Sequence, residues 1–461
     1  MFQSQQPIEI DPRHLAEVFL AAVLVRAAYL AFVHFGFGPE AMMAEDSNAF
    51  ILAAGQLASG QTLLGFDGQA NFDGSLMPVP VVLMMLAGIG PDSVLGFLAL
   101  QSVIDAGTCV LIGLTAARFV PEWFRPAGLI AAVNPTQIVL AGLVLSDSIF
   151  LFFTSAALLV IVDMARPGQQ TSGILRAAIL LGLSLGFALL TRSAILPWLP
   201  VAALAFVVLG WRRAGLMRSV LGVVLVSAIV SAALAPILYR NYQRHDAVIV
   251  TPQAGAHLLF WVVPLVANFG GVTGFDDAQT DATERRDAAL AALNGEPTYA
   301  EKEAAARQVA SEMLGEFGYF AVARAWIVGA GLNLGLPAAS IAPPVRNLPH
   351  NSFYSTPGDG AVQKVLTFLT DAENRHYVIV LGLSSVLSLA WLALAAFGMI
   401  RLFRGWPLCA FILFIWLGYI LALNGPVASP KYRLPIENVL VIAVAAALMR
   451  RPHQSIFESR S

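Results

Sequence analysis

Repeated apolar runs constrain this sequence more than any other feature. Ten of them, at roughly 17–25 residues each, are long enough to cross a bilayer as helices with modest tilt or short end caps. Apolar residues make up 57% of the 461 positions, charged residues only 12%, and the mean hydropathy is +0.72, a balance that no ordinary soluble domain shows. We therefore predict an all-helical multi-pass membrane protein with spans near 15–35, 94–117, 127–145, 148–165, 174–190, 194–210, 217–238, 377–400, 407–423 and 436–449.

Basic residues at alternate junctions between these runs predict the orientation of the chain. Short loops that stay in the cytoplasm collect Lys and Arg. On this rule both termini are cytoplasmic, the junctions at 36–93, 146–147, 191–193, 239–376 and 424–435 face outward, and the protein resides in a bacterial inner (plasma) membrane with its outer face in the periplasm. The basic junctions carry Arg118 and Arg125, then Arg166 and Arg176, then Arg212, Arg213 and Arg218, then Arg401 and Arg404, and finally Arg450 and Arg451.

Two further apolar stretches fit poorly as spans. Residues 76–90 carry two prolines, residues 319–336 carry an arginine and several glycines, and counting either one as a crossing breaks the charge alternation. We interpret both as interfacial or re-entrant helices, and if both cross, the number of spans becomes twelve. The chain then divides into an N-terminal transmembrane module (1–238) with a first outer loop (36–93), a long outer region with interfacial helices (239–376), and a C-terminal transmembrane module (377–461).

Charge and cysteine content exclude several classes of protein. The formal net charge is −2 and no basic tail is present, which argues against a nucleic-acid partner and leaves membrane lipids and small anions as natural ligands. Cys109 and Cys409 both fall inside apolar runs, so the sequence offers no disulfide framework and no CxxC metal site. The first apolar run is followed by no small-residue cleavage site, and we expect it to be retained as a span.

An acidic loop at residues 44–48 follows the first span. Between residues 36 and 75 the sequence holds five carboxylates and no Lys or Arg, as expected of a loop on the translocated side of a membrane. Glu45 and Asp46 can there bind a metal or accept a proton. The structural alternative is that Asp46 or Ser47 caps the helix expected over 48–58.

Other polar residues gather where outward-facing span ends meet the outer loops. Each has a structural alternative: Asp147 can cap the helix that it opens, Arg192 can snorkel to the interface, and Arg240 can be an anchor beside aromatic residues. Lys431 and Arg433 differ, because two cations in a short outer loop run against the positive-inside bias. That departure favours a functional role for this loop.

These charges suggest a site for a lipid-linked phosphate. Cations at a partly desolvated interface are costly unless paired, and phosphate is a natural partner for guanidinium groups. Oxygen ligands also suit a hard cation such as Mg²⁺ or Mn²⁺. The candidate set comprises Arg192, Arg240, Lys431 and Arg433 for the phosphate, Glu45, Asp46 and Asp147 for catalysis, Asp46 and Asp147 for a divalent metal, and Asn241, His257 and Tyr432 for substrate.

Five stretches, in this order, resemble those of the GT-C membrane glycosyltransferases, in particular the bacterial branch similar to dolichyl-phosphate-mannose protein mannosyltransferases and aminoarabinose lipid A transferases. The resemblance covers roughly 15–260 and 377–449. The matching stretches are the acidic Glu45-Asp46 with the helix that ends in Gly60, the Pro-Val-Pro at 78–80, the Leu-Ser-Asp-Ser at 145–148, the Arg-Asn-Tyr at 240–242 and the Lys-Tyr-Arg-Leu-Pro at 431–435.

The resemblance implies a GT-C-like bundle of about ten to twelve transmembrane helices that transfers a sugar, with inversion, from a polyprenyl-phosphate donor to a hydroxyl at the outer face. It assigns the general base to Asp46, the second acidic position of the cavity to Asp147, and positions near the donor phosphate to Arg240, Lys431 and Arg433. Met77 departs from the pattern, since relatives often have a polar residue there. Residues 261–376 match nothing in the family, which leaves the acceptor (a lipid, glycan or protein) open.

Two other classes stay open at this point. A secondary transporter or lipid flippase favours charged residues in mid-span, and a structural or assembly protein requires no convergence of the outer charges. Asp105 distinguishes the first from a transferase: in mid-span and paired it supports transport, whereas facing the outer cavity it is compatible with a transferase.

Overall fold

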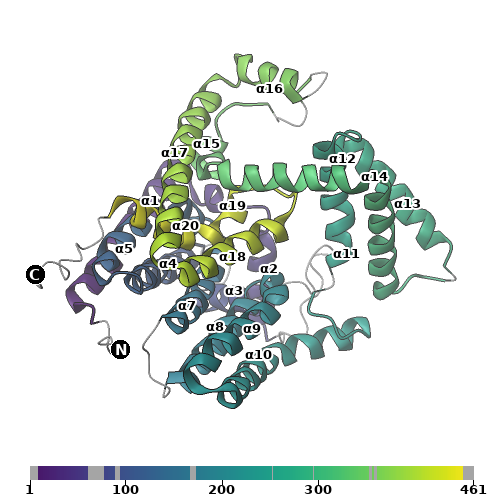
Figure 1. The fold of residues 1–461 in the computed structure, drawn as a ribbon. Helices are drawn as coiled ribbons and strands as arrows, with labels where there is room; N and C mark the ends of the chain where they lie inside the picture. The colour runs from purple at the N-terminus through teal and green to yellow at the C-terminus, as the bar shows by residue number, and fades with distance from the viewer. Residues whose placement is uncertain are drawn as a thin grey trace, which may run out of the picture.

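The computed structural model describes residues 9–60, 77–88, 94–166, 173–251, 253–293, 295–351, 356–357 and 361–449. Within these residues all regular secondary structure is helical, and turns and loops join the helices. Among these described residues, eight helical segments are long and apolar enough to cross a membrane by length and composition. Their arrangement is shown in Figure 1. They are α1 (Pro12–Phe37), α4 (Val94–Ala117), α7 (Asp147–Ala165), α9 (Leu199–Ala214) with the 3₁₀ turn Ser193–Trp198 before it, α10 (Leu216–His245), α14 (Tyr299–Gly335), α17 (Arg375–Gly405) and α18 (Pro407–Asn424).

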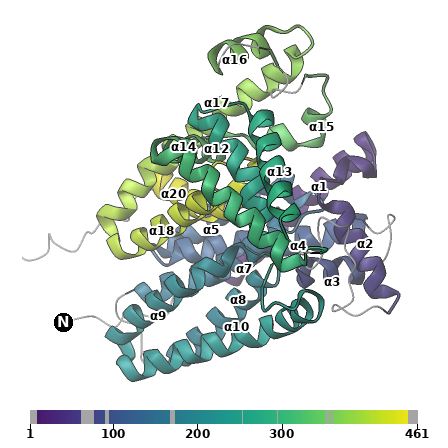
Figure 2. The same cartoon turned by 90° about the vertical axis from the view of Figure 1, so that its right-hand side faces the viewer.

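Shorter helices complete the bundle and its loops. α8 coincides with the predicted fifth span, 174–190, to within one residue. The helices α8, α9 and α10 pack side by side at one edge of the molecule (Figure 2). The shorter helices are α2 (Ser47–Ala58), α3 (Pro78–Leu86), α5 (Phe124–Ala132), α6 (Pro135–Ala141), α8 (Ile174–Leu189), α11 (Ala254–His257), α12 (Val263–Gly270), α13 (Phe275–Ala291), α15 (Pro343–Arg346), α16 (Ala361–Thr370), α19 (Pro430–Arg433) and α20 (Glu437–Leu448).

The predicted third span, 127–145, is two short helices instead of one. Pro135 has no N–H to donate and disfavours helical geometry at the residue before it, and Asn134 is extended, with its Oδ1 accepting from the Gln137 N–H at 3.1 Å. The break between α5 and α6 is therefore encoded locally. At the other end of α6, the carbonyls of residues 140, 141 and 143 accept hydrogen bonds from the Nε2 of Gln101.

The predicted last span, 436–449, corresponds to α20, which the rest of the bundle encloses. Ten of its 12 residues are buried, and the 3₁₀ turn Leu434–Ile436 joins it to α19. α17 packs so closely against it that a Cβ on Gly398 would lie 1.7 Å from the Ala443 carbonyl oxygen. The apolar residues all round this helix reflect burial in protein, which sequence periodicity does not separate from exposure to lipid.

The two apolar stretches that we interpreted as non-spanning form helices of different lengths. The first contains α3, whose nine residues extend roughly 14 Å at 1.5 Å per residue, well short of the hydrocarbon thickness of about 30 Å. Residues 76, 89 and 90 of that stretch lie outside the described residues. The second is the C-terminal half of α14, which is broken at Gly318 by a φ of 80° and a ψ of 162°.

The long outer region contains a helical unit built from α11 to α14 (Figure 1). The capping box predicted by the spacing of Thr298 and Glu301 is present at the start of α14, with both side chain to backbone bonds made. Glu303 of α14 also accepts from the Gly255 N–H at 2.7 Å, which fastens α11 to α14. The expected division of the chain at 238/239 falls inside α10, and that at 376/377 falls inside α17.

Candidate active site

Four charged side chains from distant parts of the sequence meet at one end of the bundle, which we call the site end. Asp46 lies at the start of α2, Asp147 opens α7, Arg192 follows α8, and Lys431 lies in α19. Arg192 Nη1 is 2.7 Å from Asp147 Oδ2, and Lys431 Nζ is 3.5 Å from Asp46 Oδ2. The cluster therefore alternates two carboxylates with two cations.

Backbone and hydroxyl bonds hold the two acidic segments together. The Val144 N–H donates to the Met42 carbonyl at 3.1 Å, and Ser47 Oγ donates to the Val144 carbonyl at 2.7 Å. These two bonds join the loop before α2 to the turn before α7. They place Asp46 beside the segment that carries Asp147, although the two residues are far apart in the sequence.

Asp46 lies at the N-cap position of α2, but its side chain makes no capping hydrogen bond. Ser47 does not supply the cap either, because its Oγ accepts from the Ala44 N–H and donates to the Val144 carbonyl. The predicted side-chain cap is therefore absent. The Asp46 carboxylate, 36% exposed, is directed toward Lys431 and remains accessible to a substrate.

Asp147 is the first residue of α7, with a side chain that is only 2% exposed. Ser146 is at the N-cap position, so the predicted cap by Asp147 is wrong, although the positive end of the helix dipole still favours a carboxylate there. Its Oδ2 has no hydrogen-bond partner of good geometry and is held by the charge of Arg192. Arg192 is thus an ion-pair partner and not a free snorkelling anchor.

The two cations of the cluster remain charged at neutral pH. Burial opposes the charge on Arg192, but Asp147, Tyr432 and Asp46 together outweigh it and raise the pKa of the guanidinium. Burial likewise opposes the charge on Lys431, and Tyr432, Asp46 and Asp147 raise the pKa of its ammonium overall. The Lys431 Nζ lies 5.4 Å from the centre of the Tyr432 ring, in the range of a cation–π contact.

His257 and Glu45 lie at the margin of the cluster. Desolvation and the charge of Lys431 lower the pKa of His257, so this imidazole is neutral at pH 7 and suits a hydrogen bond to a substrate hydroxyl. Glu45 is exposed, and among the described residues no ion pair or hydrogen bond joins its carboxylate to the four charges. The structure thus brings His257 and Tyr432 to the cluster and leaves Glu45 beside it.

Arg433 does not belong to this cluster, which corrects its assignment as a phosphate ligand. Its guanidinium donates to Glu437 Oε1 at 2.6 Å, to Ser388 Oγ at 2.6 Å and to the Leu334 carbonyl at 2.7 Å. The side chain is 5% exposed and Glu437 is fully buried, with its other oxygen accepting from Asn134 Nδ2 at 2.9 Å. Arg433 is a buried structural cation that positions α19.

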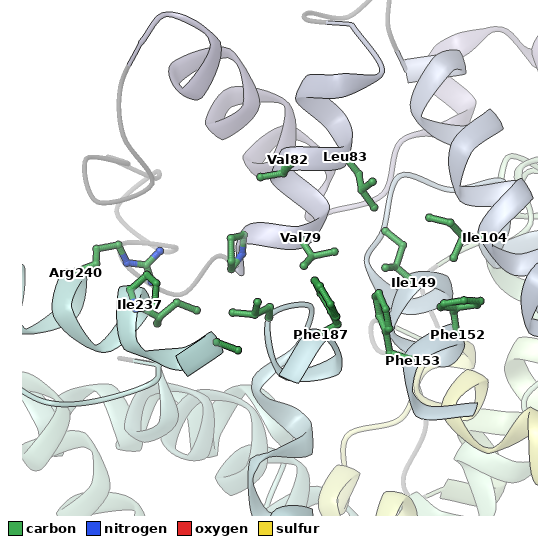
Figure 3. A pocket seen from close by; sticks show the side chains of 14 residues that line it. Val79, Val82, Leu83, Ile104, Ile149, Phe152, Phe153, Phe187, Ile237 and Arg240 are labelled. Carbon is green, nitrogen blue, oxygen red and sulfur yellow. The ribbon is translucent and has the colours of Figure 1, made fainter. Parts of the chain in front are cut away.

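Arg240 lies at one end of an apolar groove (Figure 3). The groove has a volume of about 470 Å³, and Arg240 is the one charged residue among those that line it. Leu190 and Ile149, each two positions from a charged residue of the cluster, also line it, and the Val79 N–H donates to the Leu190 carbonyl at 3.1 Å. The lining residues are Pro78, Val79, Val82, Leu83, Ile104, Ile149, Phe152, Phe153, Phe187, Leu190, Ala233, Pro236, Ile237 and Arg240.

Asn241 is withdrawn from the substrate-binding set. It is fully buried, its Nδ2 donates to the Ile249 and Val250 carbonyls, and its Oδ1 accepts from Arg240 Nε at 3.1 Å. The side chain therefore fastens the turn after α10 and orients the guanidinium of Arg240. Its polar atoms are already satisfied by protein.

The donor set does not fit a divalent metal. Asp46 and Asp147 each face a cation, and among the described residues no group of three or more His, Cys, Asp and Glu is arranged to hold a metal ion. A hard divalent cation takes about six oxygen ligands or keeps several waters. We derive no step through a metal.

Asp105 lies in mid-helix in α4 and is fully buried against Arg26 of α1. Arg26 Nε donates to its Oδ2 at 2.6 Å, and Gln137 Nε2 to its Oδ1 at 3.5 Å. A paired mid-span acid is the arrangement that was expected of a transporter. Here the pair fastens α1 to α4 and α6, the buried Cys109 thiol is a further contact of Arg26, and among the described residues no ion pair or hydrogen bond joins the pair to the four charges of the cluster.

The fold and site define a class: a multi-pass helical membrane protein with a charged cluster beside an apolar groove. The sequence profile of the family described as dolichyl-phosphate-mannose-protein mannosyltransferase matches residues 103–245. These residues include the helices that supply Asp147, Arg192, Arg240 and most of the groove. No curated protein sequence matches the chain.

Solved structures supply the other comparison. The archaeal oligosaccharyltransferase AglB from Archaeoglobus fulgidus, in complex with an inhibitory peptide and a dolichol-phosphate, is 14% identical with a TM-score of 0.51, over 94% of this chain and 50% of that one. ArnT from Cupriavidus metallidurans bound to undecaprenyl phosphate is 16% identical with a TM-score of 0.40, over 92% of this chain and 77% of that one. The chain thus spans about half the length of the archaeal protein. The resemblance seen in the sequence is confirmed at the level of fold, because this chain shares the helical fold of the archaeal oligosaccharyltransferase.

Proposed function

We propose that this protein is a membrane glycosyltransferase that moves a sugar from a polyprenyl-phosphate donor to a hydroxyl acceptor at the periplasmic face of a bacterial inner membrane, with both termini in the cytoplasm. The observation that carries the proposal is the apolar groove, which is lined by Arg240 and which approaches the cluster of two carboxylates and two cations at Ile149 and Leu190. An isoprenoid chain needs an apolar channel and its phosphate needs cations at the end. AglB, whose fold this chain shares, was solved with a dolichol-phosphate.

Each group has a role in a single displacement with inversion. Asp46, the more exposed carboxylate, accepts the proton of the acceptor hydroxyl as its oxygen attacks C1 of the sugar. The bond from C1 to the phosphate oxygen breaks, and the polyprenyl phosphate leaves with the bonding electrons. Arg192, Lys431 and Arg240 stabilise the charge that develops on this phosphate. No acid is needed at the leaving oxygen.

Asp147 holds Arg192 in place. Its carboxylate is 2% exposed against 36% for Asp46, so a proton from a bulky acceptor reaches Asp46 more readily. His257, neutral at pH 7, and Tyr432 line the approach and offer hydrogen bonds to the hydroxyls of donor or acceptor. The metal proposed from the sequence has no place in this scheme, because both of its carboxylates are engaged.

Incubating the purified protein with a panel of radiolabelled polyprenyl-phosphate sugars tests the proposal directly. We expect transfer to an acceptor, or slow donor hydrolysis in its absence, with at least one sugar. Donor binding without turnover across the whole panel, in the presence of extracts that contain envelope lipids, glycans and proteins, would contradict it.

A second candidate function, transport or flipping of a lipid, is favoured by one observation, the buried Arg26–Asp105 pair in mid-span. A flippase moves labelled polyprenyl-phosphate sugars between the leaflets of proteoliposomes without changing them. Transbilayer movement that is abolished by Asp105→Asn, with no sugar released from the lipid, would favour transport. Sugar transfer that survives the same substitution would favour the transferase.

A further inference from the structure

The helix α14 changes character at Gly318. Residues 299–317 contain six charged side chains, whereas residues 319–335 contain only Arg324. Gly318 interrupts the helix between these halves with a φ of 80°, a conformation that side chains other than glycine rarely adopt. The C-terminal half, residues 319–335, extends roughly 25 Å at 1.5 Å per residue, which is at the short end of the range for a span.

One face of this C-terminal half packs closely on protein through small residues. Ala321, Ala325, Gly329 and Asn333, spaced four apart, are all buried. A Cβ on Gly329 would lie 2.1 Å from the Gly425 carbonyl oxygen, and one on Gly270 would lie 2.8 Å from the Ala321 Cβ. This face is therefore fixed against α12 and the end of α18.

The opposite face is apolar and uncovered. Tyr319 is 95% exposed, Phe320 is 94% exposed and Ile327, about two turns further on, is 73% exposed. With the exposed Ala323 these residues form a single stripe along the helix, which we call the aromatic stripe. Two adjacent aromatic rings with almost their whole surface open are among the most exposed large side chains of the described residues.

The one cation on this half is turned aside. A Cβ on Gly271 would lie 2.9 Å from Arg324 Nη1, so the guanidinium rests over the C-terminal end of α12, where carbonyl dipoles favour a positive charge. Arg324 thus leaves the aromatic stripe free of charge. Its position also matches a side chain that keeps its head in the polar zone beside an apolar surface.

We propose that the aromatic stripe, Tyr319, Phe320, Ala323 and Ile327, is a membrane-interface anchor whose partner is the headgroup and upper acyl region of the bilayer. The charge boundary at Gly318 then coincides with the boundary between water and lipid, and the C-terminal half of α14 lies along the interface. Aromatic rings beside a polar tip prefer this depth. The surface is separate from the proposed donor groove, and the inference does not depend on the proposed reaction.

The anchor has a structural link to the candidate site. At the far end of the same half helix, Asn333 Nδ2 donates to the Val427 carbonyl at 2.9 Å, and the Asn333 Oδ1 accepts from the Ser429 N–H at 3.1 Å. The Leu334 carbonyl accepts from Arg433. The bilayer contact at one end of α14 therefore supports the segment that presents Lys431 at the other.

Site-directed spin labelling in lipid nanodiscs tests this inference. A nitroxide is placed at Phe320→Cys, and at Ser311→Cys as the matched control on an exposed position of the charged half. Both native cysteines are buried, and the signal of wild-type protein treated with the same reagent is subtracted. Relaxation by oxygen, which concentrates in lipid, is compared with relaxation by a water-soluble nickel chelate.

At position 320 we expect oxygen to relax the label several-fold more than the nickel chelate does, and the reverse at position 311. Strong relaxation by the nickel chelate at both positions would place the stripe in water and overturn the proposal. Weak relaxation by both reagents at position 320 would mean that another protein surface, such as a second copy of the chain, covers the stripe, and would overturn it equally. Both substitutions are at exposed positions, so neither disturbs the core.

Discussion

Lys431 Nζ lies 3.5 Å from Asp46 Oδ2, so the start of α19 and the start of α2 meet at the charged cluster although they lie near opposite ends of the chain. The ammonium is the charged neighbour of the proposed base, and Asp147 and Arg192 of the same cluster also act on its charge. In the proposed mechanism this lysine orients the Asp46 carboxylate toward the acceptor hydroxyl. It then stabilises the departing phosphate.

Asp46→Asn removes the proposed base while it keeps the size and polarity of the side chain. We expect transfer to fall by about 10²–10⁴-fold, the range in which a positioned base contributes. The measurement is turnover of a radiolabelled donor, with the melting temperature as a check on folding. Glu40→Gln, a carboxylate to amide change in the same loop at an exposed position, is the matched control and should retain activity. Wild-type turnover by Asp46→Asn would remove Asp46 from the mechanism.

Glu437→Ala separates structural from functional cations. It leaves the Arg433 guanidinium buried without its partner, and breaking a buried ion pair in this way typically costs about 3–5 kcal/mol. We expect a large loss of thermal stability in detergent. Lys431→Ala, by contrast, should keep the melting temperature within a few degrees and weaken binding of polyprenyl phosphate. Equal melting temperatures for wild type and Glu437→Ala would contradict the structural role of the pair.

Two pKa shifts predict how donor binding and folding stability depend on pH: that of Lys431 concerns donor binding, and that of His257 concerns stability. The pKa of Lys431 is raised above its ordinary value of 10.5, so its favourable charge is fully present below pH 10.5 and is lost only as pH rises through the higher folded value. The pKa of His257 is lowered from 6.5, so the unfolded chain takes up this proton first and stability falls as pH drops below 6.5. Titration calorimetry with polyprenyl phosphate should give a nearly constant Kd between pH 7 and pH 9. A tenfold weakening within that window would show that Lys431 or Arg192 loses its charge there.

Val82→Trp should obstruct the apolar groove. The added ring occupies part of a cavity of about 470 Å³, and we expect the KM for long-chain donors to rise by about tenfold, equivalent to about 1.4 kcal/mol. A water-soluble donor with a short isoprenoid should be affected less. Leu86→Trp, on the same helix but outside the groove and 67% exposed, is the control. Identical KM values for Val82→Trp and wild type would argue against the groove as the lipid site.

Chelation tests the conclusion that the carboxylates do not fit a metal. Because Asp46 and Asp147 each face a cation, we expect turnover to change less than twofold after dialysis against EDTA. Loss of activity that Mg²⁺ or Mn²⁺ restores would require the two ion pairs to open and would reinstate the metal proposal.

Much of the fold could be predicted from the sequence because a helix that crosses a membrane requires a long run of apolar residues. The ends of α4, α7 and α18 were located to within a residue or two. The break at Asn134 and Pro135 was also encoded, by a capping residue followed by proline, but a window that averages hydropathy passes over it. The burial of α20 inside the protein could not be predicted, because a helix that is apolar on all sides can be surrounded by lipid or by protein.

The candidate site was predicted in part for a similar reason. Asp46, Asp147, Arg192 and Lys431 stood out as charges at predicted span ends, and the structure places them together. Arg433 was misassigned although Glu437 follows it at i+4, the spacing of an ion pair on one helix face. The groove could not be predicted, because its walls come from five helices that are brought together only by packing.

The enclosure of α20 also bears on how the molecule is assembled. Its 12 residues extend roughly 18 Å at 1.5 Å per residue, too little to cross a bilayer alone, and almost every side chain is covered by helices that precede it in the chain. A segment of this kind has no stable position in lipid before its surroundings exist. The burial of α20 therefore requires that the helices around it are already packed together, so its insertion depends on their assembly.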